Sequence, residues 1–153
     1  MFSSSRDATP RDVAIQLLAR REYARAELAR KLEHKAFAAE DIDACLEALV
    51  EQGLQSDARF AESFIRSRIH RGQGVIRIKG ELRQRGIDQE TSAAAFAVVE
   101  EREAVDWFEL AREALARRFS SPGATPQERA KRERFLASRG FDFDQIRYAL
   151  SCL

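Results

Sequence analysis

The chain has 153 residues, of which 44% are hydrophobic and 33% are charged, and its formal net charge is only +1. This length fits one domain or a few small modules that share a core. The charged fraction is too high for a membrane protein, no segment approaches about eighteen uncharged apolar residues, and the first residues lack the apolar stretch of a secretory signal. The composition predicts a soluble, cytoplasmic protein.

Good helix formers dominate the sequence, which has only three prolines and seven glycines and almost no β-branched runs. We therefore expect an all-α protein. Its two cysteines, Cys45 and Cys152, have no repeated spacing and sit among apolar neighbours, which predicts buried, reduced thiols and no disulfide. His34 and His70 have no Cys or His partner at ligand spacing, so the sequence predicts no metal site and no cofactor, and the two histidines are expected on helix surfaces.

The chain divides into triplets of helices, beginning with residues 9–54. Residues 1–8 are polar and are expected to be disordered. Thr9 and Pro10 then have the character of an N-cap and a first helical residue. Apolar residues at helical spacing predict three helices, of which the third ends at Gly53.

A second triplet is expected over residues 55–101. Ser56 is placed to cap a helix with an apolar stripe that includes Phe60 and Phe64. The segment Gly72-Gln73-Gly74 separates this helix from the next, because glycine disfavours helix interiors and readily takes the left-handed geometry that ends a helix. Asp88 opens the third helix.

The third triplet is expected over residues 102–153. Its first helix is predicted to run from about Arg102 to Phe119. The loop that follows ends in Thr125-Pro126-Gln127-Glu128, which has the spacing of a full capping box with Pro at the first helical position. A second box, Asp142 to Gln145, opens the last helix.

Overlaying the triplets exposes a tandem repeat. Leu32, Leu82 and Leu136 match, at spacings of 50 and 54 residues. Four positions after each leucine comes a small residue: Ala36, Gly86 or Gly140. Each small residue is followed by a large apolar one: Phe37, Ile87 or Phe141. Such self-similarity predicts three tandem three-helix bundles in an elongated, curved array.

Basic charge is concentrated in the second triplet. Seven of the 26 Lys and Arg residues lie between positions 66 and 85 with one acid, Glu81: Arg66, Arg68, Arg71, Arg77, Lys79, Arg83 and Arg85. Lys79 and Arg83 share a helix face with no acid between them, whereas Glu62 is spaced to neutralise Arg66 and the helix around it. The run is either a solvated face that keeps the protein soluble or an anion-binding surface.

Four motifs in this order resemble the RecX family of bacterial RecA regulators: REYARAELARKL (21–32), SDARFAESFIRSRIHRGQG (56–74), ELRQRGI (81–87) and FLASRGFDFDQI (135–146). The resemblance covers about residues 11–150. It implies a non-enzymatic regulator of homologous recombination, DNA repair and the SOS response. The resemblance implies that such a protein binds the RecA recombinase, lodges in the groove of the RecA–DNA filament and either inhibits strand exchange and ATP hydrolysis or promotes filament shortening. It also implies an ability to contact DNA.

One position departs from the family pattern. Where the family usually has a Ser or Thr cap before the second helix, this chain has Ala24. The missing hydroxyl leaves Glu27 without its capping-box partner, at an expected cost of about 1 kcal/mol.

The resemblance and the concave surface expected of stacked helical repeats favour contact between the seven basic residues and RecA or DNA. Arginine suits phosphate and carboxylate alike. Because the protein is nearly neutral, we expect only weak, salt-sensitive and sequence-independent binding to bare DNA, and we expect a monomer. Two alternatives remain. One is a direct DNA-binding module with the helix around 75–85 in a groove, and the other is a scaffold for helical proteins that uses the apolar helix edges.

Other candidates have simpler interpretations. A second cluster, Arg129, Lys131, Arg132 and Arg134, is expected to serve helix pairing, such as Glu128 with Arg132. Trp107 and Phe108 are expected to pack in a core or between modules. No catalytic Ser/His/Asp or Cys/His set is recognisable, and the segment 72–74 lacks the strand-to-helix setting of a nucleotide loop, so the sequence predicts no enzyme.

Overall fold

A computed structural model describes residues 8–153 and contains, within that range, nine α-helices and no strand. The first set is α2 (Pro10–Leu18), α3 (Arg25–His34) and α4 (Ala39–Glu51); the second is α5 (Asp57–His70), α6 (Val75–Gln84) and α7 (Gln89–Arg102); the third is α8 (Trp107–Arg118), α9 (Pro126–Ser138) and α10 (Phe143–Ser151). We call these sets repeats 1, 2 and 3. The all-α prediction is confirmed. The predicted disorder of residues 1–8 concerns a segment of which 1–7 lie outside the described residues.

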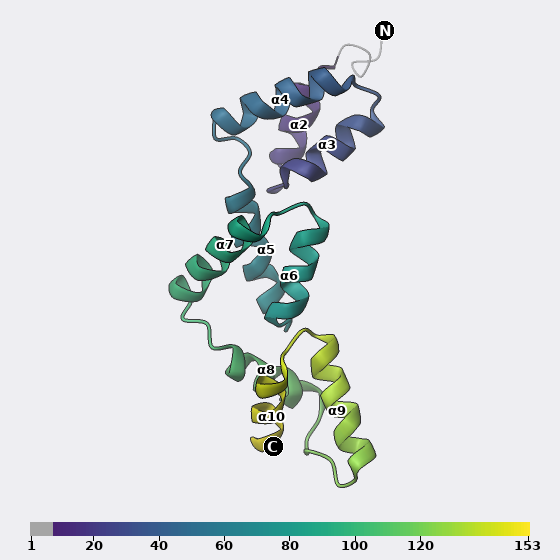
Figure 1. The fold of residues 1–153 in the computed structure, drawn as a ribbon, viewed down its shortest axis with the longest axis vertical. Helices are drawn as coiled ribbons and strands as arrows, with labels where there is room; N and C mark the ends of the chain where they lie inside the picture. Colours follow the sequence, from purple (N-terminus) through teal and green to yellow (C-terminus); the bar gives the residue numbers. More distant parts are fainter. Residues whose placement is uncertain (1–7) are drawn as a thin grey trace.

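The repeats follow one another along the long axis of the molecule (Figure 1). The second helix of each repeat, α3, α6 or α9, lies on one flank of this array, on the right in Figure 1. Each repeat has its own cluster of buried apolar side chains. The predicted elongated array of three-helix bundles is therefore confirmed.

The matched positions of the sequence repeat have the same role in each bundle. Leu32, Leu82 and Leu136 are all fully buried at the end of the second helix. The residue four positions later has a positive φ each time: 67° at Ala36, 86° at Gly86 and 101° at Gly140. The amide of the next residue then donates back to the leucine carbonyl, over 3.0–3.4 Å. This is the backbone closure of a Schellman-type helix end.

Side-chain caps begin most of the helices where the sequence places them. Thr9, Ser56, Asp88 and Asp142 each accept a hydrogen bond from the backbone amide three residues on. The box predicted at Thr125 is only half formed, because the Glu128 carboxylate accepts from the Ala124 amide instead of the Thr125 amide.

The predicted helix over residues 102–119 is wrong at its start. Helix α7 continues to Arg102, a turn follows in which Ala104 has a φ of 50°, and α8 begins at Trp107. The turn contains neither Gly nor Pro. Its local signal is Asp106, whose carboxylate accepts from the first amides of α8; an N-cap of this kind defines a helix start.

Several predicted burials require correction. Trp107 packs against the core of repeat 2, as expected of a residue between modules. Phe108, in contrast, is 42% exposed and packs edge-on against Tyr148. Cys45 is half-buried, and Cys152, the C-cap residue of α10, is exposed, so the predicted burial of Cys152 is wrong. His34 and His70 are exposed on α3 and α5, as predicted.

No helix in residues 8–153 combines the length and apolarity needed to cross a bilayer.

Candidate partner-binding surface

Helix α6 separates the predicted basic residues into two groups. Side chains four positions apart share a helix face, whereas those two positions apart point in nearly opposite directions. Arg77 and Glu81 therefore lie on one face, and Lys79 and Arg83 lie on the other. The seven cations do not form one continuous surface.

The first face of α6 is occupied by ion pairs. Glu81 lies 3.6 Å from the Arg68 guanidinium and 3.3 Å from that of Arg77. Arg68 is also stacked on Phe64, with its Cζ 4.3 Å from the ring centre, and only 16% of its side chain is exposed. Burial lowers the pKa of the Arg68 guanidinium, and the Glu81 carboxylate opposes that effect. Arg68 and Arg77 are largely neutralised within the repeat.

Arg85 binds across the joint between repeats 1 and 2. Its Nη1 donates to Glu27 Oε2 over 2.7 Å, and the other oxygen of the same carboxylate accepts from the Ala24 amide over 3.0 Å. Ala24 itself is fully buried within the core cluster of repeat 2. The residue that lacks a capping hydroxyl is thus a core residue of the neighbouring repeat. As predicted, Ala24 supplies no side-chain cap to α3. Glu27 nevertheless accepts from the Ala24 amide and gains Arg85 as a partner from repeat 2.

Side chains near the start of α5 also bind repeat 1. Asp57 Oδ1 accepts from the Arg25 amide over 2.8 Å and from Gln55 Nε2 over 2.9 Å. The buried Gln55 amide also donates to the Tyr23 carbonyl over 3.1 Å. Hydrogen bonds between buried polar groups and backbone fix orientation, so this joint holds repeats 1 and 2 in one relative position.

The joint between repeats 2 and 3 consists mainly of backbone. The Gly74 amide donates to the Arg139 carbonyl over 2.7 Å, and the Ile76 amide donates to the Gly140 carbonyl over 3.0 Å. Arg77 adds a bond from Nη1 to the Ser138 carbonyl over 3.3 Å. The end of α9 therefore supplies acceptors to the otherwise unpaired first amides of α6. The predicted helix break at 72–74 is thus also an inter-repeat contact.

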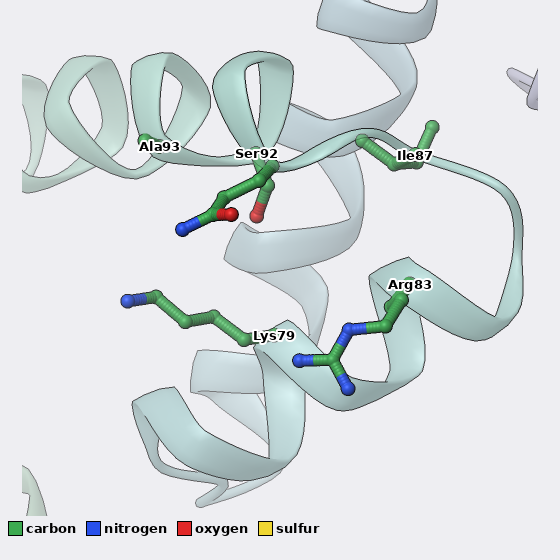
Figure 2. A pocket seen from close by; sticks show the side chains of 6 residues that line it. Lys79, Arg83, Ile87, Ser92 and Ala93 are labelled. Carbon is green, nitrogen blue, oxygen red and sulfur yellow. The ribbon is translucent and has the colours of Figure 1, made fainter.

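The second face of α6 carries the uncompensated charge. Lys79 and Arg83 line a hollow of about 200 Å³ between α6 and the first turns of α7, together with Ile87, Gln89, Ser92 and Ala93. Figure 2 shows Lys79 and Arg83 on α6 and Ser92 on the opposing wall. No carboxylate lines this hollow, and neither cation has an acidic partner within 4 Å among the described residues. This is the face that the sequence predicts to be free of acids.

The remaining two predicted cations lie elsewhere. Arg66 pairs with Glu103 at 3.8 Å, and Glu62 pairs with Arg102 at 3.5 Å. The predicted pairing of Glu62 with Arg66 is therefore wrong, because the end of α7 brings competing partners alongside α5. Arg71 is exposed at the end of α5.

Arg71 faces a second hollow, between α5 and repeat 3, that sequence reasoning missed. Its other basic lining residues are Arg117, Arg118 and Arg139. These three arginines come from two helices separated by a loop, so no single stretch of sequence has unusual charge. The alignment of the repeats is the only signal that could have found them.

The second basic cluster also differs from its prediction. Arg132 donates to the backbone carbonyls of Ser121 and Glu128, over 2.7 and 2.8 Å. Its guanidinium lies 4.4 Å from the centre of the Phe119 ring. Arg132 therefore fastens the loop before α9, and the predicted ion pair with Glu128 is wrong because the loop carbonyl occupies the guanidinium.

Three successive three-helix bundles, joined by specific polar contacts and carrying basic hollows, define an all-helical tandem-repeat protein. Family models for the RecX domains match the same three bundles in order. Residues 11–49 match the first three-helix domain of RecX, residues 56–95 the second and residues 104–150 the third. The chain belongs to the RecX family.

Curated relatives agree over nearly the full length. Regulatory protein RecX of Chromohalobacter salexigens is 57% identical over 148 residues, which cover 97% of this chain and 95% of that protein. The protein of the same name from Halorhodospira halophila is 46% identical over 140 residues, covering 91% and 84% respectively. The crystal structure of RecX from Lactobacillus salivarius has a TM-score of 0.77 at 24% identity and covers 94% of both chains, which supports the fold.

Proposed function

We propose that this chain binds the RecA recombinase on DNA and inhibits recombination by occupying the groove of that filament. Its membership of a family of regulatory proteins supports a regulatory role. The observation that carries the binding proposal is the hollow lined by Lys79 and Arg83, because no acidic side chain lines it to compensate their charge. In this proposal the protein catalyses no reaction, needs no cofactor and acts as a cytoplasmic monomer.

The arrangement of the repeats suits a long, periodic partner. Separate cores give an extended body, and polar contacts hold each joint in one geometry. A rigid body of this kind can bridge neighbouring protomers of a filament. Its occupancy then opposes the motions and the DNA exchange that recombination requires.

The seven predicted contact residues have unequal parts in this proposal. Lys79, Arg83 and Arg71 have no acidic partner in the described chain and are the proposed contacts. The others already bind carboxylates of their own chain and mainly hold the surface in shape: Arg66, Arg68, Arg77 and Arg85. Their charges contribute less because each is compensated nearby.

Direct DNA binding through α6 is the less favoured alternative. A recognition helix places its N-terminal residues against base edges in the major groove. Here the first turn of α6 lies against Gly140, and its amides are already bonded to repeat 3. The net charge of +1 also gives little affinity for bare duplex DNA.

The test compares two double variants of equal charge. We expect K79A/R83A to weaken binding to RecA assembled on single-stranded DNA by at least about tenfold, because charge-assisted hydrogen bonds contribute about 1.5–3 kcal/mol each. The control K131A/R134A removes one exposed Lys and one exposed Arg from α9 and is expected to bind like the wild type.

Two results would contradict the proposal. If K79A/R83A inhibits RecA as well as the wild type, the hollow is only solvated charge. If the wild type binds bare DNA as tightly as it binds the filament, the chain is a DNA-binding module. A scaffold for other helical proteins would bind neither.

A further inference from the structure

Four arginines converge on the hollow at the joint of repeats 2 and 3. Arg71 comes from the end of α5, Arg117 and Arg118 from α8, and Arg139 from the end of α9. The hollow measures about 260 Å³, and none of its lining residues is acidic. We call it the arginine hollow. A concave site lined by charge of one sign raises the local concentration of the opposite charge.

An aromatic ring holds two of these arginines in place. The Cζ atoms of Arg118 and Arg139 lie 5.2 and 4.9 Å from the centre of the Phe135 ring. Among the described residues, only Arg117 of the four has a carboxylate within reach, Glu113 at 4.0 Å. The guanidinium groups of Arg118 and Arg139 are therefore held in place before a ligand arrives, and the charge of the four arginines is mostly uncompensated.

The same place in repeat 1 is also a basic hollow. The repeats can be aligned on the N-cap residues of their first helices, Thr9, Ser56 and Asp106, and on their buried leucines. In this alignment Arg117 corresponds to Arg20, and Arg139 corresponds to Lys35. In repeat 1 these positions line a hollow together with Lys31 and His34, again without an acid.

Carboxylates close the equivalent place in repeat 2. The residues that correspond to Arg118 and Arg139 are Arg68 and Arg85, and both stack on Phe64. There, however, Glu81 pairs with Arg68, and Glu27 from repeat 1 pairs with Arg85. Carboxylates thus satisfy this arginine arrangement in the middle repeat, whereas repeat 3 presents it to solvent.

We propose that the arginine hollow binds phosphate groups of a nucleic-acid strand. Guanidinium forks bind phosphate oxygens bidentately, and a phosphodiester chain repeats its charge along its length. Four arginines spread over three helices match such a chain better than an isolated carboxylate, which one fork can satisfy. Contacts to phosphate carry no sequence information, so binding through them is independent of sequence.

The test measures the full chain alone, by fluorescence anisotropy of a labelled oligo(dT) strand over a range of salt concentrations. Each phosphate contact with a single strand contributes about 0.7 to the slope of log affinity against log salt. R118Q/R139Q is therefore expected to lower the slope by about 1.4 and to weaken binding. The control K131Q/R134Q removes equal charge from α9 outside the hollow and is expected to keep the wild-type slope.

A second variant keeps every charge. Phe135→Leu retains apolar volume but removes the ring that orders Arg118 and Arg139, and it is expected to weaken binding while circular dichroism stays helical. Parallel titrations with a duplex of equal length distinguish single from double strands as the phosphate source. A titration with polyglutamate tests an acidic protein segment.

The proposal is overturned if R118Q/R139Q keeps the wild-type slope, or if the control loses as much. It is also overturned if R118Q/R139Q weakens only polyglutamate binding. Because RecA is absent from this experiment, the outcome does not depend on the function proposed above.

Discussion

Substituting Gly74 by Ala tests the joint between repeats 2 and 3. The residue has a φ of −97° and a ψ of 173°, a backbone conformation that alanine adopts without strain. A Cβ atom there would lie 2.6 Å from the Gly140 carbonyl oxygen and 2.8 Å from Phe141 Cδ1. The backbone of the turn after α9 cannot yield as a flexible side chain can, so the two repeats must separate.

Separation breaks the bonds from the Gly74 and Ile76 amides to repeat 3. Each backbone hydrogen bond contributes a net of about 0.5–1.5 kcal/mol, so the loss is about 1–3 kcal/mol. Replacing glycine by alanine also lowers the conformational entropy of the unfolded chain, which favours the folded state by about 0.4–1 kcal/mol. The midpoints of these two ranges differ by about 1.3 kcal/mol, and we expect G74A to be less stable than the wild type by about that amount.

Gly80→Ala is the matched control on the same helix. A Cβ at Gly80 would meet no atom within 4 Å, so alanine should stabilise α6 by about 0.5–1 kcal/mol. Urea unfolding gives both stabilities, and hydrogen exchange at the Ile76 amide reports the joint directly. The reasoning fails if G74A matches the wild type in stability and in Ile76 protection, or if G80A is destabilised to the same extent.

Three further predictions concern other positions. Leu136→Ala empties a fully buried site and should cost about 2–5 kcal/mol in urea unfolding; a cost below 1 kcal/mol would contradict its place in the core. Ala36 has a φ of 67°, so Ala36→Gly relieves backbone strain and should stabilise the protein by about 0.5–1 kcal/mol. Urea unfolding measures this gain, and an unchanged stability would show that the position is not strained. The amide of Thr91 lowers the pKa of the Asp88 carboxyl. The stability advantage of the wild type over D88N should therefore be complete above the ordinary carboxyl pKa and disappear as the pH falls through the lowered value. Urea midpoints across the acid range check this, and a constant difference would refute it.

Local features of the sequence were sufficient to predict most of the helical pattern. Thr9, Ser56 and Asp142 cap helices within three residues of themselves, and the leucine at the end of each second helix needs only its periodicity to be recognised. The wrong prediction of where α8 starts, over residues 103–106, also has a local cause. An alanine with positive φ replaced the glycine that normally marks such a turn.

The state of each arginine was not predictable in this way. Arg85 binds a carboxylate 58 residues away, and Arg77 binds a carbonyl 61 residues away. Spacing along a helix indicates which charges share a face, as it did for Lys79 and Arg83. It cannot indicate which acid a neighbouring repeat brings to that face.

The amino-acid sequence by itself determined the number of repeats, the turn that ends each second helix and the concentration of positive charge in repeat 2, since these follow from contacts within a few residues. Only the tertiary structure decided that Ala24 belongs to the core of the next repeat, that Gly74 meets Gly140, and which cations remain without a carboxylate. The physical reason is that an ion pair or a backbone bridge depends on distance in space, and the joints between repeats set that distance.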